Sequence, residues 1–370
     1  MDRFGEKVCC NPTVKLKKQE SYPVIDIDKI TPGYKTVRSV ESLEYAGQGG
    51  AKFQDHDVLF ARITPCLENG KMAIADTDGQ NGIGSTELFV FRGIEGVSDT
   101  DYIYYLLCMK HIRQLAANSM TGASGRQRAD LDFIKRIQWD FPDIKIQKKI
   151  SSVLSEYDNL IEVNNKRIKV LEQMAENLYK EWFVRFRFPG HETAEFENGI
   201  PKGWEYKRLD ELLDIRYGKD HKNIEDGDIP IFGSGGLMRT GNKALYEGES
   251  VLIPRKGSLN NIMYYNGAFW TVDTMFYSIQ LIRHFAKYAY FFLSNIDMES
   301  YNSGAALPSM TTDILYHFKL LVPNEEVLRR FDLFVSRLFE QKTIIHKLNE
   351  NLVQQRDLLL PRLMSRKLEV

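Results

Sequence analysis

A segment in the middle of the chain returns near its end. The stretch "LEQMAENL" at Leu171–Leu178 recurs as "LVQQRDLL" at Leu352–Leu359, 181 positions later, with leucines and glutamine in the same places. The same shift maps Pro142 onto Pro323. A chain of 370 residues is also longer than one hydrophobic core usually serves. The repeat therefore indicates a duplicated unit.

Each copy contains a short strand followed by a long helix. Apolar residues alternate just before Pro142 and Pro323, as in a strand that a proline closes. Beyond each proline, apolar residues recur in alternating steps of four and three, from Ile150 to Trp182 in the first copy. This heptad spacing predicts two long helices, which we expect to pair as an antiparallel coiled coil.

The second helix has polar residues in its apolar seam. Lys342, Asn349 and Arg356 occupy positions that the first copy gives to apolar residues. Because Leu348 lies beside them, the sequence favours a slightly rotated register for the second helix.

A segment of mixed composition separates the two copies. "FRFPGHETAEFENGIPKGW" at residues 186–204 has the Pro, Gly and acidic residues of a linker. It argues against the alternative that both helices are core elements of one large α/β domain. The expected fold class is α+β, with two mainly-β domains alternating with two long helices in an internal pseudo-twofold repeat. The expected boundaries are a first domain at 1–143, a helix at 144–186, a linker at 187–203, a second domain at 204–323, a helix at 324–363 and a tail at 364–370.

The two globular blocks resemble each other more loosely than the helices do. "DVLFARITPCLENGK" at residues 57–71 and "SVLIPRKGSLNNIMYY" at residues 250–265 both place an apolar strand directly before an arginine, Arg62 or Arg255. A polar loop follows each arginine. Aromatic and β-branched residues with frequent turns predict that both blocks are mainly β, with short helices.

We find no catalytic motif in the chain. "IPIFGSGGL" at residues 229–237 is a weak match to a nucleotide-binding turn, because such a turn must open onto a helix. The seven histidines are scattered and never take metal-ligand spacing. We therefore expect neither a catalytic residue nor a metal site.

Charge and apolar content limit where the chain acts. It has 49 Lys and Arg against 50 Asp and Glu, so any nucleic-acid binding must depend on local patches. No apolar run approaches the roughly 20 residues of a membrane span. The N-terminus has no apolar signal region, and the four cysteines have no CxxC spacing. We expect reduced thiols and a cytoplasmic protein that contacts no membrane.

The phrases "DVLFARITPCLENGK", "GIGSTELFVF", "LYKEWFVRF" and "LLLPRLMS", in this order and with the repeat, resemble the specificity subunits of type I restriction–modification systems. The resemblance covers nearly the whole chain. "IPKGWEYKRLDELL" at residues 200–213 is similar to the usual opening of a recognition domain in that family. The chain's own start, "MDRFGEKV", is shorter and lacks the Gly-Trp pair.

The resemblance implies a non-catalytic subunit that gives a complex its DNA sequence specificity. Two target-recognition domains would each read one half of a bipartite, asymmetric site in double-stranded DNA, and the helices would set the spacer. Two adenine-N6 methyltransferase subunits would dock on the chain, and up to two restriction subunits would join them. S-adenosylmethionine and ATP would belong to these partners, with no cofactor in this chain. The competing interpretations are a coiled-coil scaffold that binds only protein, and an inactive specificity cassette.

Loops after paired strands supply the candidate DNA contacts, because they carry side chains that read base edges or grip phosphate. The candidates for DNA binding are Arg62, Asn69, Lys71, Arg126, Arg128, Arg239, Lys243, Arg255, Lys256, Asn260 and Asn261. The candidates for partner binding lie on the helices, where we expect Trp182 and Phe183 to be exposed. These candidates are Leu171, Leu178, Trp182, Phe183, Leu352 and Leu359.

Overall fold

The computed structural model describes residues 1–123, 125–304 and 308–369. It divides into two compact units. The first unit contains Met1–Arg167 and the chain from Ile345 onward, and the second contains Ile168–Ile344. Each unit therefore combines one β-rich block with segments of both long helices. The tail expected at 364–370 is described as far as Glu369, and Val370 lies outside the described residues.

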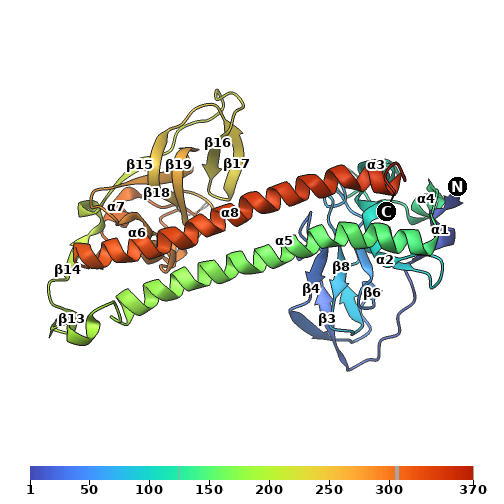
Figure 1. Ribbon diagram of the computed structural model, residues 1–370, viewed down its shortest axis with the longest axis horizontal. Coiled ribbons are helices and arrows are strands. Elements are labelled where there is room, and N and C mark those ends of the chain that lie inside the picture. The colour runs from blue at the N-terminus through green and yellow to red at the C-terminus, as the bar shows by residue number, and fades with distance from the viewer. Residues whose placement is uncertain (124, 305–307, 370) are drawn as a thin grey trace. The chain divides into compact units, whose positions relative to one another are not determined.

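The β-rich block of the first unit contains a five-stranded sheet of order β2-β10-β7-β8-β4 and a four-stranded sheet of order β5-β3-β9-β6 (Figure 1). Four short helices accompany these sheets, and the short strand β1 pairs with β11. The elements are β1 (Asp2–Arg3), α1 (Phe4–Lys7), β2 (Val8–Cys10), β3 (Ser21–Ile25), β4 (Thr36–Arg38), β5 (Glu41–Glu44), β6 (Ala51–Phe53), β7 (Val58–Ala61), β8 (Met72–Asp76), β9 (Gly82–Gly84), β10 (Leu88–Gly93), α2 (Thr100–Cys108), α3 (Lys110–Asn118), α4 (Leu131–Arg136) and β11 (Gln138–Trp139).

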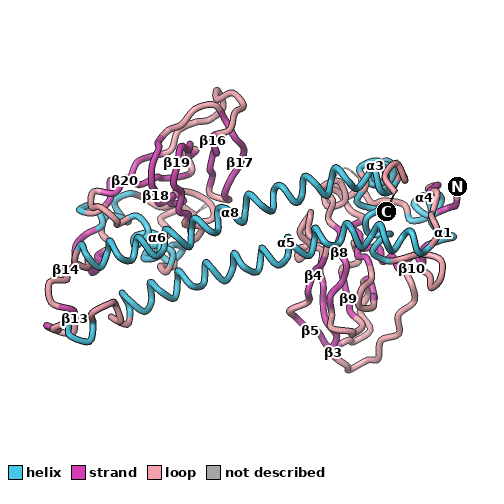
Figure 2. The backbone as a smooth tube through the Cα atoms, viewed as in Figure 1, coloured by secondary structure: helices cyan, strands magenta, loops and turns pink. Residues whose placement is uncertain are grey.

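The block of the second unit contains a six-stranded sheet of order β15-β20-β18-β19-β16-β17 (Figure 2). Two small strand pairs, β12 with β13 and β14 with β21, flank it in the sequence. The elements are η2 (His191–Thr193), β12 (Phe196–Glu197), β13 (Ile200–Pro201), β14 (Glu205–Arg208), η3 (Leu209–Glu211), β15 (Leu213–Tyr217), β16 (Ile229–Gly233), β17 (Gly236–Gly241), β18 (Tyr246–Pro254), β19 (Met263–Thr271), β20 (Met275–Gln280), α6 (Ala286–Ser294), η4 (Met298–Tyr301), α7 (Thr312–Tyr316) and β21 (Lys319–Val322).

The two blocks share one strand topology. In each, a central hairpin pairs with a later strand, which pairs in turn with the first strand of its sheet. Strands β6 and β7 together take the place of β18, and β8 and β9 that of β19. The parallel pair Val24 and Ile83 in the first block recurs as Ile231 and Trp270 in the second. The glycine-rich stretch at residues 229–237 contains the turn of the β16–β17 hairpin and does not open onto a helix.

The openings of the two blocks also correspond. The backbone N–H of Phe4 donates to Ile137 O (2.8 Å), and that of Leu209 donates to Phe318 O (2.9 Å). Ile137 and Phe318 are related by the 181-residue shift, whereas Phe4 and Leu209 lie further apart in sequence. The first block therefore opens as the second does, although its start lacks the Gly-Trp pair, and its loops are longer.

The long helices are α5 (Ile144–Tyr179), which continues as the π-helical turn η1 (Lys180–Val184), and α8 (Glu325–Met364). Within the first unit, early residues of α5 lie against late residues of α8, as in the contact of Asp158 with Arg356. Within the second unit, Glu172 contacts Lys342 in the same antiparallel sense. The expected α+β fold with an antiparallel pair of long helices is confirmed, whereas the exact domain boundaries stay a prediction.

The polar seam residues of α8 have partners on α5, so the expectation of a rotated register is wrong. Asn164 Nδ2 donates to Asn349 Oδ1 (2.8 Å), and Lys342 Nζ lies 2.6 Å from Glu172 Oε1. Asn349 is 9% exposed, whereas the neighbouring Leu348 is 46% exposed. Because each polar residue finds a partner on α5, the seam keeps the register of the first copy.

The distal end of each long helix completes the core of a block. In the second unit Tyr179, Trp182 and Phe183 are buried among residues of α6, α8 and Trp204. The expected exposure of Trp182 and Phe183 is therefore wrong, because the block and α8 cover both rings. In the first unit Leu360, Leu363 and Met364 of α8 are buried in the core of the block.

Candidate nucleic-acid interface

Arg62 and Arg255 occupy equivalent places, each directly after the central strand of its block. The backbone N–H of Ala129 donates to Arg62 O (2.8 Å), and that of Met310 donates to Arg255 O (2.8 Å). The N–H groups of the two arginines also bond to equivalent loops, at Glu87 O (2.9 Å) and Thr274 O (2.8 Å). The same set of backbone hydrogen bonds therefore holds both arginines in their blocks.

The Arg62 guanidinium lies against an aromatic ring. Its central carbon is 4.6 Å from the centroid of Phe89, and its Nε is buried without a hydrogen-bond partner among the described residues. The nearby carboxylate of Glu87 is taken by Arg128 at 2.8 Å and 2.5 Å. These bonds hold the pKa of Glu87 below its ordinary value. Stacking on Phe89 restricts the orientation of the Arg62 guanidinium. Because Arg128 pairs with Glu87, the positive charge of Arg62 is left without that partner.

Arg255 has a different setting. Its guanidinium lies 5.3 Å from the ring centroid of Tyr217, and Nη1 donates to Asp273 O (3.1 Å). The residue equivalent to Glu87 is the neutral Thr274, so no acidic side chain occupies that position. Lys256 next to it is half-buried, and its backbone forms a bridge with Ser309.

The asparagines of the second loop hold the loop in place. Asn260 Nδ2 donates to Asp297 Oδ1 (3.1 Å), and its Oδ1 accepts from the backbone N–H of Met298 (2.7 Å). Asn261 Nδ2 donates to Ser234 O (2.8 Å), which joins the loop to the β16–β17 turn. These bonds occupy the amide groups that would otherwise face a base. Base reading by these asparagines stays a prediction.

The remaining candidates in the first block surround the Arg62 loop. Lys71 Nζ donates to Ile27 O (2.9 Å), whereas Asn69 is exposed. Arg126 is exposed in the loop that ends at Arg128, and that loop joins the Arg62 loop through the backbone pair of Ile63 with Arg128. The structure therefore brings all five first-block candidates into two adjoining loops.

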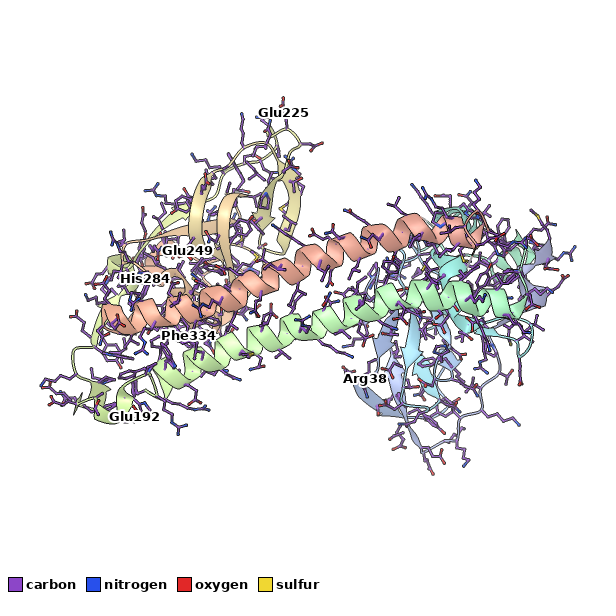
Figure 3. All side chains as sticks on the ribbon, in the orientation of Figure 1. Arg38, Glu192, Glu225, Glu249, His284 and Phe334 are labelled. Carbon is purple, nitrogen blue, oxygen red and sulfur yellow. The ribbon has the colours of Figure 1, made fainter. Side chains whose placement is uncertain are left out.

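Two candidates of the second block lie on a separate part of its sheet. Arg239 Nη2 donates to the carbonyl oxygens of His221 (2.7 Å) and Ile224 (2.9 Å). Lys243 is exposed in the segment after β17. It follows Asn242, whose backbone N–H donates to the carbonyl oxygen (2.9 Å) of Glu225, labelled in Figure 3. Arg239 thus fixes the loop at residues 221–226, and its hydrogen bonds go to that loop and to Thr240.

The sequence reasoning missed Arg113. Its side chain leaves no room for a Cβ at Gly70 in the Arg62 loop, and its Nε is buried without a partner among the described residues. Arg113 lines a cavity of about 700 Å³ together with Lys110 and Arg356. Arg113 lies on α3, far from the loop in sequence, so only the fold reveals its proximity to the Arg62 loop.

The leucine candidates for partner binding are not fully exposed on the helices. Leu171, Leu178, Leu352 and Leu359 are half-buried, and Leu178 and Leu359 pack against the cores of their units. Other apolar side chains of the helices are exposed instead. On α5 these are Ile146, Val153, Leu160, Val163, Val170 and Met174, and on α8 they are Leu333, Phe334, Ile344, Leu348 and Leu358.

Apart from Leu333, this second set follows its own heptad pattern, and we call these residues the outer stripe. Val153, Leu160 and Val163 show its spacing of sevens and threes on α5. Phe334 and Ile344 on α8 are the repeats of Val153 and Val163. An exposed apolar stripe on a helix is typical of a surface that another protein covers. A second heptad search beside the main seam would have found it in the sequence.

The described residues contain no cluster of three His, Cys, Asp or Glu side chains that could hold a metal ion. The four cysteines form no disulfide, and burial raises the pKa of Cys10 and of Cys108 to about 12. Both groups are therefore protonated thiols at neutral pH. Among the described helices, none has the length and apolar character of a membrane span.

Comparison with known proteins identifies the architecture. The sequence pattern described as the type I restriction modification DNA specificity domain matches residues 7–173 and 201–354. The type I restriction enzyme MjaIX specificity subunit of Methanocaldococcus jannaschii is 26% identical over 305 residues, covering 73% of this chain and 69% of that protein. The type I restriction enzyme HindI specificity subunit of Haemophilus influenzae is 22% identical, covering 86% of this chain and 88% of that protein.

A solved structure shares the fold. The crystal structure of the S subunit of a type I restriction–modification system from M. genitalium aligns with a TM-score of 0.56 and 16% sequence identity. The alignment covers 98% of this chain and 95% of that chain. Because the family pattern also covers both blocks and most of both long helices, the chain belongs to the type I restriction modification DNA specificity family.

Proposed function

We propose that this chain is the non-catalytic specificity subunit of a type I restriction–modification complex, in which each β-rich block reads one half of a bipartite, asymmetric DNA site. The observation that carries the proposal is the placement of Arg62 and Arg255. Equivalent backbone bonds hold both arginines at strand ends, whereas the side chains around them differ. Two loops with equivalent backbones but different side chains suit two different half-sites.

The arginines have the chemistry that base reading needs. A guanidinium fork donates two hydrogen bonds to the O6 and N7 of guanine, or to a phosphate. Stacking on Phe89 or Tyr217 restricts each fork, so less conformational entropy is lost on binding. Arg113 and Arg126 lie on or beside the first loop and would contact the DNA backbone.

The outer stripe is the proposed docking surface for two methyltransferase subunits that modify adenine N6. Because Val153 and Val163 recur as Phe334 and Ile344, α5 and α8 offer two related copies of one surface, which suits two copies of one partner. S-adenosylmethionine would be bound by those subunits. Up to two restriction subunits, with ATP, would complete the complex in the cytoplasm.

The specificity role is tested by co-expression with the neighbouring methyltransferase subunit in a host without other modification. Long-read mapping of N6-methyladenine is expected to show a bipartite motif with a constant gap. Exchange of residues 212–321 for a homologous block is expected to change one half of that motif. If the complex assembles but methylates no motif, the chain is a protein scaffold or an inactive cassette and the proposal fails.

The docking surface has a separate test. A charge at Val163 or at Ile344 is expected to remove one methyltransferase copy, because each side chain is about half exposed or more and belongs to one stripe. Native mass spectrometry of the purified complex counts the copies. Retention of both copies in the Val163→Glu and Ile344→Glu variants would contradict the assignment.

A further inference from the structure

We infer that the long helices encode which halves of the chain pair: the first half, up to Asn198, selects the second half, from Gly199, and rejects a second copy of itself. This inference concerns assembly and goes beyond the proposed function. Because α8 repeats α5 with a shift of 181, α5 could also pair with another α5, and α8 with another α8. The polar residues of the seam decide between these arrangements.

The first selective layer is a buried ion pair. In the first unit Arg356 Nη1 lies 2.5 Å from Asp158 Oδ1, and these side chains are only 12% and 4% exposed. Tyr105 adds a hydrogen bond from its hydroxyl to Asp158 Oδ2. The repeat places Phe339 and Ala175 at the equivalent positions of the second unit. The layer is thus ionic in one unit and apolar in the other.

The apolar version of this layer is well packed. Phe339 lies 5.1 Å from Tyr264 and 6.2 Å from Phe291 between ring centroids. Ala175 is fully buried in the same core. The second unit therefore fills this level with apolar side chains.

The second selective layer is an amide pair. Asn164 Nδ2 donates to Asn349 Oδ1, and Asn349 Nδ2 donates to Asn165 Oδ1 (3.0 Å). The equivalent positions are Ile345 and Ile168, which are 7% and 6% exposed. A buried asparagine facing another asparagine is stabilised, whereas one facing isoleucine has an unpaired amide.

Pairing of two like helices would remove the polar partners in both layers, at two places in each layer. Two copies of α5 would set each Asp158 opposite Ala175 and each Asn164 opposite Ile168. Two copies of α8 would set Arg356 opposite Phe339 and Asn349 opposite Ile345. Each self-paired assembly would therefore bury two charges and two amides without the partner they have in the chain, which is strongly unfavourable.

The ends of the helices select in the same direction by size. The second block receives Tyr179, Trp182 and Phe183, whereas the first block receives their repeats Leu360, Leu363 and Met364. Self-pairing would force aromatic rings into the first core or leave cavities in the second core. Both changes are unfavourable in a close-packed interior.

The test uses the intact, folded chain. A protease site is inserted between Asn198 and Gly199, which are exposed in the turn between β12 and β13, and the folded protein is cleaved there. Tagged and untagged cleaved protein are mixed and warmed until fragments exchange. Native mass spectrometry then counts assemblies of unlike halves and of like halves. Chance pairing would give about equal numbers of the two kinds.

We expect fewer than about one assembly in twenty to contain like halves, because even one unpaired buried charge is worth more than a tenfold disadvantage. The variant Asp158→Phe, Asn164→Ile, Asn349→Ile, Arg356→Ala gives the first unit the apolar layers of the second. Its share of like halves is expected to rise at least fivefold. The charge exchange Asp158→Arg with Arg356→Asp is the matched control and is expected to keep unlike halves together.

Two outcomes would overturn the inference. One is a near-equal mixture in the unsubstituted protein, which requires no variant to fold. The other is a fourfold variant that pairs unlike halves as strictly as the unsubstituted protein does. If that variant does not fold, the milder pair Asn164→Ile with Asn349→Ile replaces it, again with a rise in like halves expected. None of these readouts involves DNA, so failure here is distinct from failure of the specificity role.

Discussion

Each β-rich block is fastened to a long helix by a nearly buried lysine, but the two fastenings differ in charge. In the first unit Lys35 contacts Asp101 of its own block and donates to the hydroxyl of Ser155 on α5 (2.6 Å). In the second unit Lys287 contacts Glu249 of its own block and Asp332 of α8 (2.6 Å). The first helix thus offers a neutral oxygen, whereas the second offers a carboxylate.

This difference makes the second fastening more dependent on its lysine. The Lys287 side chain is 3% exposed, and Glu249 and Asp332 are 22% and 16% exposed. Figure 3 shows Glu249 and His284 on the same side of the second block. Two partly buried carboxylates around one cation are stable only while the cation is present. Both units keep a histidine beside the lysine, because His56 lies 2.9 Å from Asp101 and His284 lies 2.8 Å from Asp332. The first unit, however, has one carboxylate at its lysine, whereas the second has two.

The largest expected effect is therefore that of Lys287→Met. Loss of the cation leaves Glu249 and Asp332 facing each other, which is expected to lower the free energy of unfolding of the second unit by about 3–5 kcal/mol. The matched control Lys35→Met is expected to cost the first unit about 1–3 kcal/mol, because only Asp101 loses a charge partner. Hydrogen exchange at increasing urea concentration, read on peptides of each block, separates the units. Equal losses would contradict the comparison.

The next effect concerns the equivalent arginines. Arg62→Ala and Arg255→Ala are each expected to weaken binding of the assembled complex to its site by about tenfold to a hundredfold, as for loss of one bidentate base contact. Each loss is expected to relax specificity in one half-site only. Titration with duplexes altered in either half measures this. Arg38→Ala is the matched control, because the exposed Arg38 already pairs with Asp78.

A uniform loss on all duplexes would show that the arginine contacts phosphate instead of a base.

A smaller effect is expected where the two arginine loops differ in charge. Glu87→Gln removes a carboxylate beside Arg62 and is expected to raise affinity for the first half-site severalfold at low salt, because phosphates are repelled less. Thr274→Glu introduces a carboxylate at the equivalent position and is expected to lower affinity for the second half-site by a similar factor. Binding measured at two salt concentrations checks both. Changes of the same sign would break the equivalence of the loops.

The smallest effect is a pH dependence of the first unit. The hydrogen bond with Asp101 raises the pKa of His56 above its ordinary value. A raised pKa means that this pair stabilises the folded state fully below about pH 6.5 and loses that contribution as the pH rises through the folded-state pKa. The loss is on the order of a few tenths of a kcal/mol, since the His56 side chain is 57% exposed.

Urea unfolding of the first unit between pH 6 and 8 measures this loss, and His56→Gln is expected to flatten the profile. An unchanged profile in that variant would assign the dependence to another group.

The sequence predicted the elements that depend on periodicity. The heptad spacing from Ile150 to Trp182 and its repeat predicted both long helices, and the strand before Arg62 or Arg255 predicted the equivalent loops. It could not reveal which polar seam residues meet, because the partner of Arg356 is set by the antiparallel register. For the same reason Trp182 looked exposed on an isolated helix, whereas α8 and the second block cover it.

The loops depended on contacts that no spacing shows. Arg113 reaches the Arg62 loop only because α3 packs beneath Gly70. Asn260 reads as a polar loop residue in the sequence, but its amide is taken by Asp297 and Met298. Candidate contacts chosen by residue type alone therefore mix groups that face solvent with groups that hold the loop.

The burial of Leu360, Leu363 and Met364 in the first block has a consequence for synthesis of the protein. The ribosome finishes the first block's own strands at β11, but the residues that complete its core are added only after the whole second block. At roughly 5–20 residues per second, the nascent first block waits about 10–45 s for them. The second block already has Tyr179, Trp182 and Phe183 when it emerges. The block that is made first is therefore the one that finishes folding last.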